Sequence, residues 1–150
     1  MTGPDPTDVD PPGRDGGSAD VAAANAAFYA AFEQADVDAM AGIWDDLQPE
    51  ALTCIHPGWP ALRGREQVLR SWSALMANTE YIQFFLTDVT VAVEGDIAVV
   101  TCTENVLTGV SETGGAGAAV ATNVFRRRGH GWRLQVHHAG PLLSELDGQP

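Results

Sequence analysis

Apolar residues in the first part of the chain recur at helical spacing. Between residues 19 and 34, an Ala-rich stretch places Val21, Phe28 and Phe32 on one face of a helix. Ser18 immediately precedes this stretch and is a suitable N-cap. The pattern therefore predicts a first helix over 19–34.

Two more helices are predicted before residue 80. Asp36 is a suitable N-cap for a short helix that ends before Pro49. After a short strand candidate at 51–56 and a loop, residues 65–78 have the pattern of a third helix. The apolar residues that define the buried faces are Val37, Met40 and Trp44 in the second helix, and Val68, Leu69, Trp72, Leu75 and Met76 in the third.

Beyond residue 80 the pattern changes to that of strands, rich in Val, Thr and aromatic residues. The predicted strands cover 81–94, 97–109, 118–128 and 132–139. They are separated by turn sequences, namely EGD, SETGGAG and RGHG. Short turns between long strands favour an antiparallel meander, and helices followed by strands indicate an α+β fold with the helices on one sheet face.

Each of three strands places one polar residue on a face that is otherwise apolar. Because side chains alternate along a strand, Glu104 shares a face with Val100 and Cys102, and Asn123 shares one with Ala121 and Phe125. By the same rule, His138 falls on the core-facing side of the last strand, with Trp132, Leu134 and Val136.

The hairpins give a first prediction of how these three residues pair. If the SETGGAG hairpin is symmetric about residues 113 and 114, Glu104 lies opposite Asn123. If the next hairpin is centred between residues 129 and 130, Asn123 faces Val136, with His138 as its diagonal neighbour about 7 Å away. A carboxylate, an amide and an imidazole would then converge on one apolar hollow.

Such a cluster could transfer protons. Burial raises the pKa of a carboxyl group, so Glu104 could act as base or acid, with His138 as its proton partner and Asn123 as an anchor for a substrate carbonyl. That chemistry corresponds to isomerisation, dehydration or aldol-type cyclisation. Alternatively, the three side chains could satisfy one another as a buried polar network without any ligand.

Three further residues are candidates for binding a substrate. His56 ends the predicted strand beside the GWP loop, where it could line the mouth of a pocket. Trp59 lies in that loop and could act as a lid or cover the core. Tyr29, on the first helix, could present its hydroxyl inward.

Composition and charge narrow the classes of partner. The chain has eight Arg, no Lys and twenty acidic residues, with a net charge of −12, so nucleic acid and anionic membranes are not expected as partners. There is no apolar run of membrane-spanning length and no secretory pattern in the first twenty residues, which predicts a cytoplasmic protein. Residues 1–18, rich in Pro, Gly and Asp, predict a disordered tail.

The two cysteines and four histidines do not have the spacing of a zinc site. Cys54 and Cys102 lie in apolar runs and are expected to be buried, reduced thiols. We therefore expect no metal ion and no other cofactor.

Several motifs resemble the SnoaL-like branch of the nuclear transport factor 2-like superfamily, over residues 19–141. The matching stretches are AAFEQADVDAMAGIW, TCIHPGW, LRGREQVLRSW, VVTCTEN and ATNVFRRRGHGWRLQVHHAGP. The resemblance implies a cone formed by a bent sheet and three helices, with a pocket inside and often a homodimer formed through the outer sheet face. It also implies that residues 142–150 form a short tail after the domain.

Members of that superfamily include ketosteroid isomerases, polyketide cyclases, dehydratases, epoxide hydrolases and non-catalytic binding domains. The Tyr-plus-Asp set of the isomerases and the Asp-Arg-Asp set of the epoxide hydrolases are not recognisable here. Two hypotheses follow: a pocket protein with acid/base chemistry on a small apolar or aromatic molecule, or a non-catalytic dimeric binding or accessory domain.

Overall fold

A computed structural model describes residues 17–109 and 115–143 of the 150-residue chain. Most of the two predicted tails, namely residues 1–16 and 144–150, lies outside the described residues. Ser18, predicted as an N-cap, instead begins the first helix, and Gly17 takes the N-cap position in a left-handed conformation.

The three predicted helices are confirmed. They are α1 (Ser18–Glu33), α2 (Val37–Ile43) and α3 (Arg65–Ala77), with a short 3-10 helix, η1 (Pro49–Ala51), between the last two. Asp36 caps α2, because its Oδ1 accepts a hydrogen bond of 3.0 Å from the backbone N–H of Ala39. Met40 and Trp44 are buried as predicted, whereas Val37 is exposed.

The strands form one mixed sheet. They are β1 (Thr53–Ile55), β2 (Leu62–Arg63), β3 (Ile82–Glu94), β4 (Ile97–Thr108), β5 (Gly115–Arg128) and β6 (Gly131–Pro141), in the order β2-β1-β6-β5-β4-β3. The predicted α+β class and the antiparallel meander β3–β6 are confirmed. The short strand β1 pairs in parallel with β6, and the two-residue β2 was not predicted.

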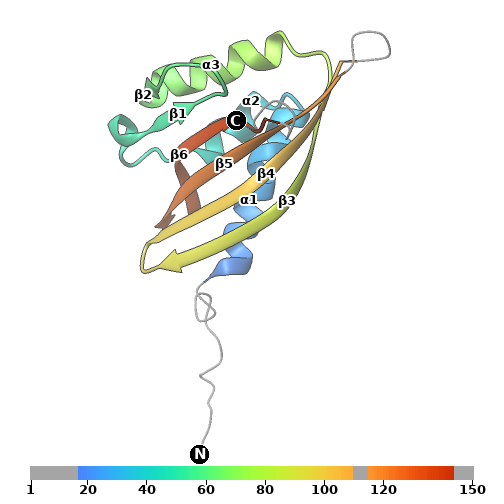
Figure 1. Ribbon diagram of the computed structural model, residues 1–150. Coiled ribbons are helices and arrows are strands. Elements are labelled where there is room, and N and C mark those ends of the chain that lie inside the picture. The colour runs from blue at the N-terminus through green and yellow to red at the C-terminus, as the bar shows by residue number, and fades with distance from the viewer. Residues whose placement is uncertain (1–16, 110–114, 144–150) are drawn as a thin grey trace, which may run out of the picture.

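The long strands curve around α1, as Figure 1 shows, and α3 lies with β1 and β2 near one end of the sheet. The core fills the space between α1 and the concave sheet face, where Phe28 makes edge-to-face contacts with Trp44 and Trp72. Both cysteines are free and buried, as expected. No helix in the described part of the chain is long and apolar enough to cross a bilayer.

The register of β4 and β5 differs by four residues from the predicted one. Glu104 pairs with Ala119 and Asn123 pairs with Val100, whereas the symmetric hairpin predicted Glu104 opposite Asn123. A shift by an even number leaves every side chain on its own face. Glu104 and Asn123 therefore both point inward as predicted, but they are not opposite each other.

The prediction for His138 is wrong, because β6 contains a bulge. Val124 pairs with Val136 while Phe125 pairs with Leu134, which leaves Gln135 as an extra residue and reverses the alternation of side chains after it. His137 is consequently buried opposite Asn123. His138 pairs with Thr122 and is exposed on the outer face of the sheet.

Candidate functional site

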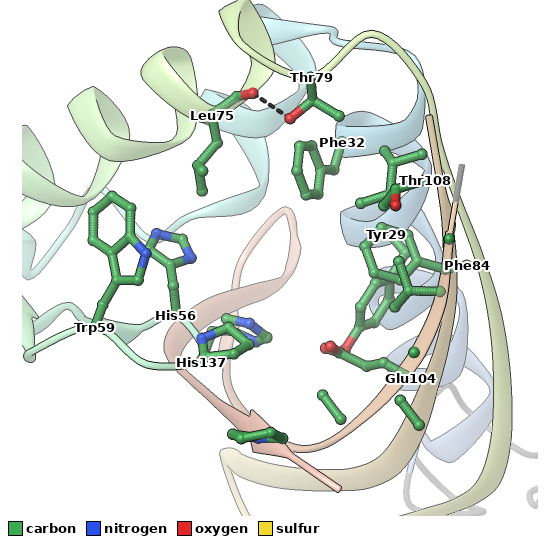
Figure 2. A pocket seen from close by; sticks show the side chains of 18 of the residues that line it. Tyr29, Phe32, His56, Trp59, Leu75, Thr79, Phe84, Glu104, Thr108 and His137 are labelled. Atoms are coloured by element: carbon green, nitrogen blue, oxygen red, sulfur yellow. Dashed lines mark hydrogen bonds between the residues drawn. The ribbon is translucent and has the colours of Figure 1, made fainter. Parts of the chain in front are cut away.

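A cavity of about 530 Å³ lies between α1, α3 and the inner face of the sheet. This volume falls within the range of small-molecule sites. Figure 2 shows its side chains gathered around an open centre. Its larger apolar lining residues are Phe28, Phe32, Pro57, Trp59, Trp72, Leu75, Ile82, Phe84, Val106 and Pro141.

One wall of the cavity carries a tyrosine–carboxyl pair. The hydroxyl of Tyr29, on α1, donates a hydrogen bond of 2.6 Å to Oε2 of Glu104, on β4. Burial raises the pKa of the Glu104 carboxyl group, and the bond from Tyr29 opposes part of that rise. Burial also raises the pKa of Tyr29, so its hydroxyl keeps its proton. The pair thus places a carboxyl group with a raised pKa in an apolar cavity.

Two histidines lie on the opposite side in Figure 2. His137 Nδ1 is 2.6 Å from Oδ1 of Asn123, and burial lowers the pKa of His137 to about 3. His56 Nε2 is 2.9 Å from the hydroxyl oxygen of Ser71, and burial lowers the pKa of His56 to about 4. Both imidazoles are therefore neutral at physiological pH.

The tautomer of His56 follows from its partner. The Ser71 hydroxyl donates its single proton to the carbonyl oxygen of Val68 at 2.7 Å, so its oxygen must accept from His56 Nε2–H. Trp59 packs edge-on against the same imidazole, with ring centroids 4.9 Å apart, and is exposed at the mouth of the cavity.

Four of the six predicted site residues line the cavity: Tyr29, His56, Trp59 and Glu104. Asn123 points inward but lies behind Tyr29 and His137, where it is fully buried and does not line the cavity. His138 lies on the other side of the sheet.

His137 is not among the predicted site residues, since strict alternation places it on the outer face and nothing in the local sequence marks the bulge. Trp72 is predicted to be a core residue, and it lines the cavity as well. The helical spacing that placed Phe28 and Phe32 on one face of α1 was the available signal for the aromatic wall.

The electrostatics of the cavity disfavour an anionic ligand. Among the described lining residues there is no Arg, Lys or Asp, and Glu104 is the acidic one. A carboxylate or phosphate group on a ligand would lose its hydration without gaining an opposite charge. Within residues 17–109 and 115–143, no group of three or more His, Cys, Asp or Glu side chains is arranged to hold a metal ion.

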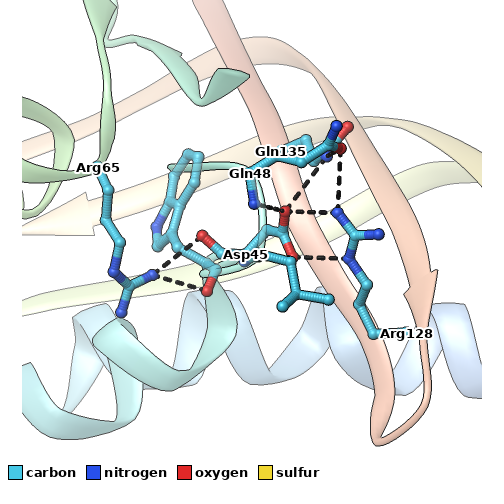
Figure 3. A network of polar contacts seen from close by, with 7 residues as sticks. Asp45, Gln48, Arg65, Arg128 and Gln135 are labelled. Carbon is cyan, nitrogen blue, oxygen red and sulfur yellow. Dashed lines mark hydrogen bonds and ion pairs between the residues drawn. The ribbon is translucent and has the colours of Figure 1, made fainter. Parts of the chain in front are cut away.

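A second polar network lies outside the cavity and holds the bulged strand (Figure 3). The buried Asp45 accepts hydrogen bonds of 2.8 and 2.7 Å from Nε and Nη2 of Arg128, and one of 3.4 Å from Gln135. Its pKa lies well below the usual range, chiefly because of Arg128. Arg65 donates to the carbonyl oxygens of Ala41, Trp44 and Asp45 at the end of α2.

A family model described as a SnoaL-like domain matches residues 21–144 of the chain. Among solved structures, the chain is similar to a protein from Streptomyces avermitilis proposed to be a dehydratase of the NTF2-like family. The two are 49% identical with a TM-score of 0.81, and the match covers 87% of this chain and 99% of that one.

A second structure is proposed to be the association domain of a calcium/calmodulin-dependent protein kinase type II from Thiobacillus denitrificans. It is 34% identical with a TM-score of 0.73, over 81% of this chain and 94% of that one. A third, an NTF2-like protein with a cystatin-like fold from Novosphingobium aromaticivorans, is 26% identical with a TM-score of 0.66, over 83% and 80%. No curated protein matches the chain.

Proposed function

Because the chain belongs to the SnoaL-like family and has the NTF2-like fold, we propose that it binds a small, uncharged, largely apolar molecule and transfers a proton within it. The reaction class is dehydration or isomerisation. The 49% identity to a protein proposed to be a dehydratase supports this class. Fold alone would not, since one fold hosts many activities.

The observation that carries the proposal is the Tyr29–Glu104 pair in an otherwise apolar cavity. A carboxyl group whose pKa is raised by burial is a stronger base than an exposed one, and it can take up a proton and return it. Tyr29 lies on α1 and orients the carboxyl group of Glu104 through this hydrogen bond. The position of the carboxyl group therefore does not depend on a loop.

Glu104 would take a proton from a carbon next to a carbonyl group. In an isomerisation it would return that proton to another carbon of the same molecule. In a dehydration, Glu104 would return the proton to a hydroxyl group of the same molecule. That hydroxyl group then leaves as water while the carbon–carbon double bond forms. Either way the carboxylate is regenerated and no other reactant is consumed.

Glu104→Gln tests this proposal, because it keeps the shape of the side chain and removes the titrating group. Thermal-shift screening of hydrophobic ketones, steroids and aromatic polyketides would identify ligands for turnover assays. The variant should lose 10²- to 10⁴-fold in turnover while keeping ligand affinity. Glu94→Gln, at an exposed end of the neighbouring strand, is the control. Full activity in Glu104→Gln would rule out the assignment.

A second candidate is a non-catalytic binding or accessory domain. It is supported by the 34% identity to a protein proposed to be a kinase association domain. It is also supported by the hydrogen bonds of the cavity, in which the protons of Tyr29, His56 and His137 are all directed at protein atoms. Ligand binding without turnover in the same screen would favour this candidate.

A further inference from the structure

Asn123 connects the two walls of the cavity without lining it. Its Nδ2 donates to Oδ1 of Asn25 at 2.8 Å and to the hydroxyl oxygen of Tyr29 at 3.2 Å, and its Oδ1 lies 2.6 Å from His137 Nδ1. The side chain is 0% exposed, and Asn25 is also buried. Both donors and the acceptor of this amide are therefore used inside the protein.

The direction of these hydrogen bonds follows from the number of protons available. Tyr29 has one hydroxyl proton and donates it to Glu104. Its oxygen must therefore accept from Asn123, which turns the NH₂ group of the amide towards Tyr29 and its carbonyl oxygen towards His137. An amide oxygen can only accept, so His137 carries its proton on Nδ1.

The other ring nitrogen, Nε2, then bears a lone pair. It makes no hydrogen bond within the described part of the chain, while the ring itself lines the cavity. Protonation does not change this arrangement near neutral pH, because burial holds the pKa of His137 at about 3. Towards a ligand, His137 is therefore an acceptor and not a donor.

We propose that Asn123 is a positioning residue that holds His137 as a hydrogen-bond acceptor, so that the cavity selects ligands presenting a hydroxyl group to this wall. A hydroxyl can donate to Nε2, whereas a carbonyl oxygen in the same place would meet a second lone pair. Sites built to hydrogen-bond a substrate hydroxyl discriminate strongly against analogues that lack it. The selectivity rests on the proposed ligand-binding function, but the tautomer does not.

The tautomer can be measured without any ligand. Nitrogen-15 NMR of the histidine ring, with His137 assigned by its loss in His137→Gln, should show a protonated Nδ1 and an unprotonated Nε2 at pH 7. The opposite tautomer, or a rapid average of the two, would overturn the proposal.

The selectivity can be measured with a matched alcohol and ketone, 1-tetralol and 1-tetralone. Because Trp59 and Trp72 line the cavity, quenching of tryptophan fluorescence would report binding of either probe. The wild type should bind the alcohol at least tenfold more tightly. In Asn123→Asp, a carboxylate next to Nδ1 should raise the pKa of His137 and put a proton on Nε2 at pH 6. The preference should then reverse towards the ketone.

The matched control is Thr122→Asp, which adds the same charge one residue away on the outer sheet face. It should leave both the tautomer and the preference unchanged. A wild type that binds the ketone as tightly as the alcohol would overturn the selectivity. If neither probe binds, the binding function fails instead, and the NMR result still decides the role of Asn123. If Asn123→Asp does not fold, the wild-type spectrum and preference remain decisive.

Discussion

Gly117 lies on the cavity-lining side of β5, where neither its backbone conformation nor its neighbours require a glycine. Its φ is outside the positive range that favours glycine, and a Cβ placed there would meet no atom within 4 Å. It pairs with Val106, which lines the cavity as well. The missing side chain therefore leaves space next to Glu104 that a ligand could use.

Gly117→Val should fill that space. We expect it to weaken binding of bicyclic or larger ligands by about tenfold or more, since added side-chain volume excludes part of the ligand. It should also raise the free energy of unfolding by about 0.5 kcal/mol, because glycine is unfavourable inside a strand. Isothermal titration and denaturant unfolding measure the two effects.

The control for this change is Gly140→Val on β6. Gly140 pairs with Val120, outside the cavity, and a Cβ there also meets no atom within 4 Å. The Gly140→Val variant should show a similar increase in the free energy of unfolding and should bind the ligand as tightly as the wild type does. Equal affinities of the Gly117→Val variant and the wild type would show that the ligand does not reach this part of the cavity.

Strand β6 has contacts that are distant in sequence, because it pairs with β1 and its Gln135 contacts Asp45. Its extra residue, Gln135, is turned towards Asp45, which is bound by two nitrogens of Arg128 on β5. Removing one partner of a buried ion pair leaves the other uncompensated, which is more costly than losing an exposed pair. The loop after α2 and the bulged strand are thereby held together.

Asp45→Asn should lower the free energy of unfolding by about 2–3 kcal/mol. The amide can no longer balance the charge of Arg128, and one of its groups becomes a donor facing the donors of Arg128 and Gln135. Asp46→Asn, at the exposed neighbouring residue, should change stability by less than about 0.5 kcal/mol. Urea unfolding of the two variants checks the difference, and equal stabilities would show that the network contributes little.

The same strand explains which part of the site could be predicted from the sequence. Hydrophobic periodicity predicted three helices and four long strands, because it is a local property that burial reinforces. It placed Glu104 and Asn123 on the inner face even though their register was wrong, since an error of four residues preserves parity. The bulge could not be predicted, because the local sequence does not mark it and its extra residue, Gln135, contacts Asp45, 90 residues away in the chain. His137 was therefore missed and His138 misplaced.

For the molecule as a whole, the two buried histidines predict a loss of stability in mild acid. The folded-state pKa values are about 4 for His56 and about 3 for His137, below the ordinary 6.5. The unfolded chain thus binds more protons below pH 6.5, so stability is greatest above that pH and falls as the pH decreases. Glu104, whose pKa is raised, acts in the opposite direction and offsets part of the loss.

Between pH 6.5 and 5, each histidine should lower the free energy of unfolding by about 1.6 kcal/mol. Denaturant titrations at several pH values measure the slope. His56→Gln should reduce this slope by about half, whereas His130→Gln, in an exposed turn, should leave it unchanged. A stability independent of pH in this range would contradict burial of the neutral imidazoles.

The outer face of the sheet is predicted to form the interface of a homodimer. It exposes Val120, Phe85 and Leu107 on three adjacent strands. A sheet face that exposes several large apolar side chains is a candidate interface. We expect the wild type to elute at twice the 15.8 kDa mass of one chain.

Val120→Asp should shift this equilibrium to the monomer, because each chain would bury an unpaired carboxylate in the interface. Val120 is 46% exposed and its replacement should leave the fold intact, which circular dichroism can verify. Leu47→Asp is the control, since Leu47 is 64% exposed but lies after α2, away from the sheet face. It should remain dimeric. A wild type that sediments as a monomer at all concentrations would refute the interface, while the cavity and its hydrogen bonds, formed within one chain, would be unaffected.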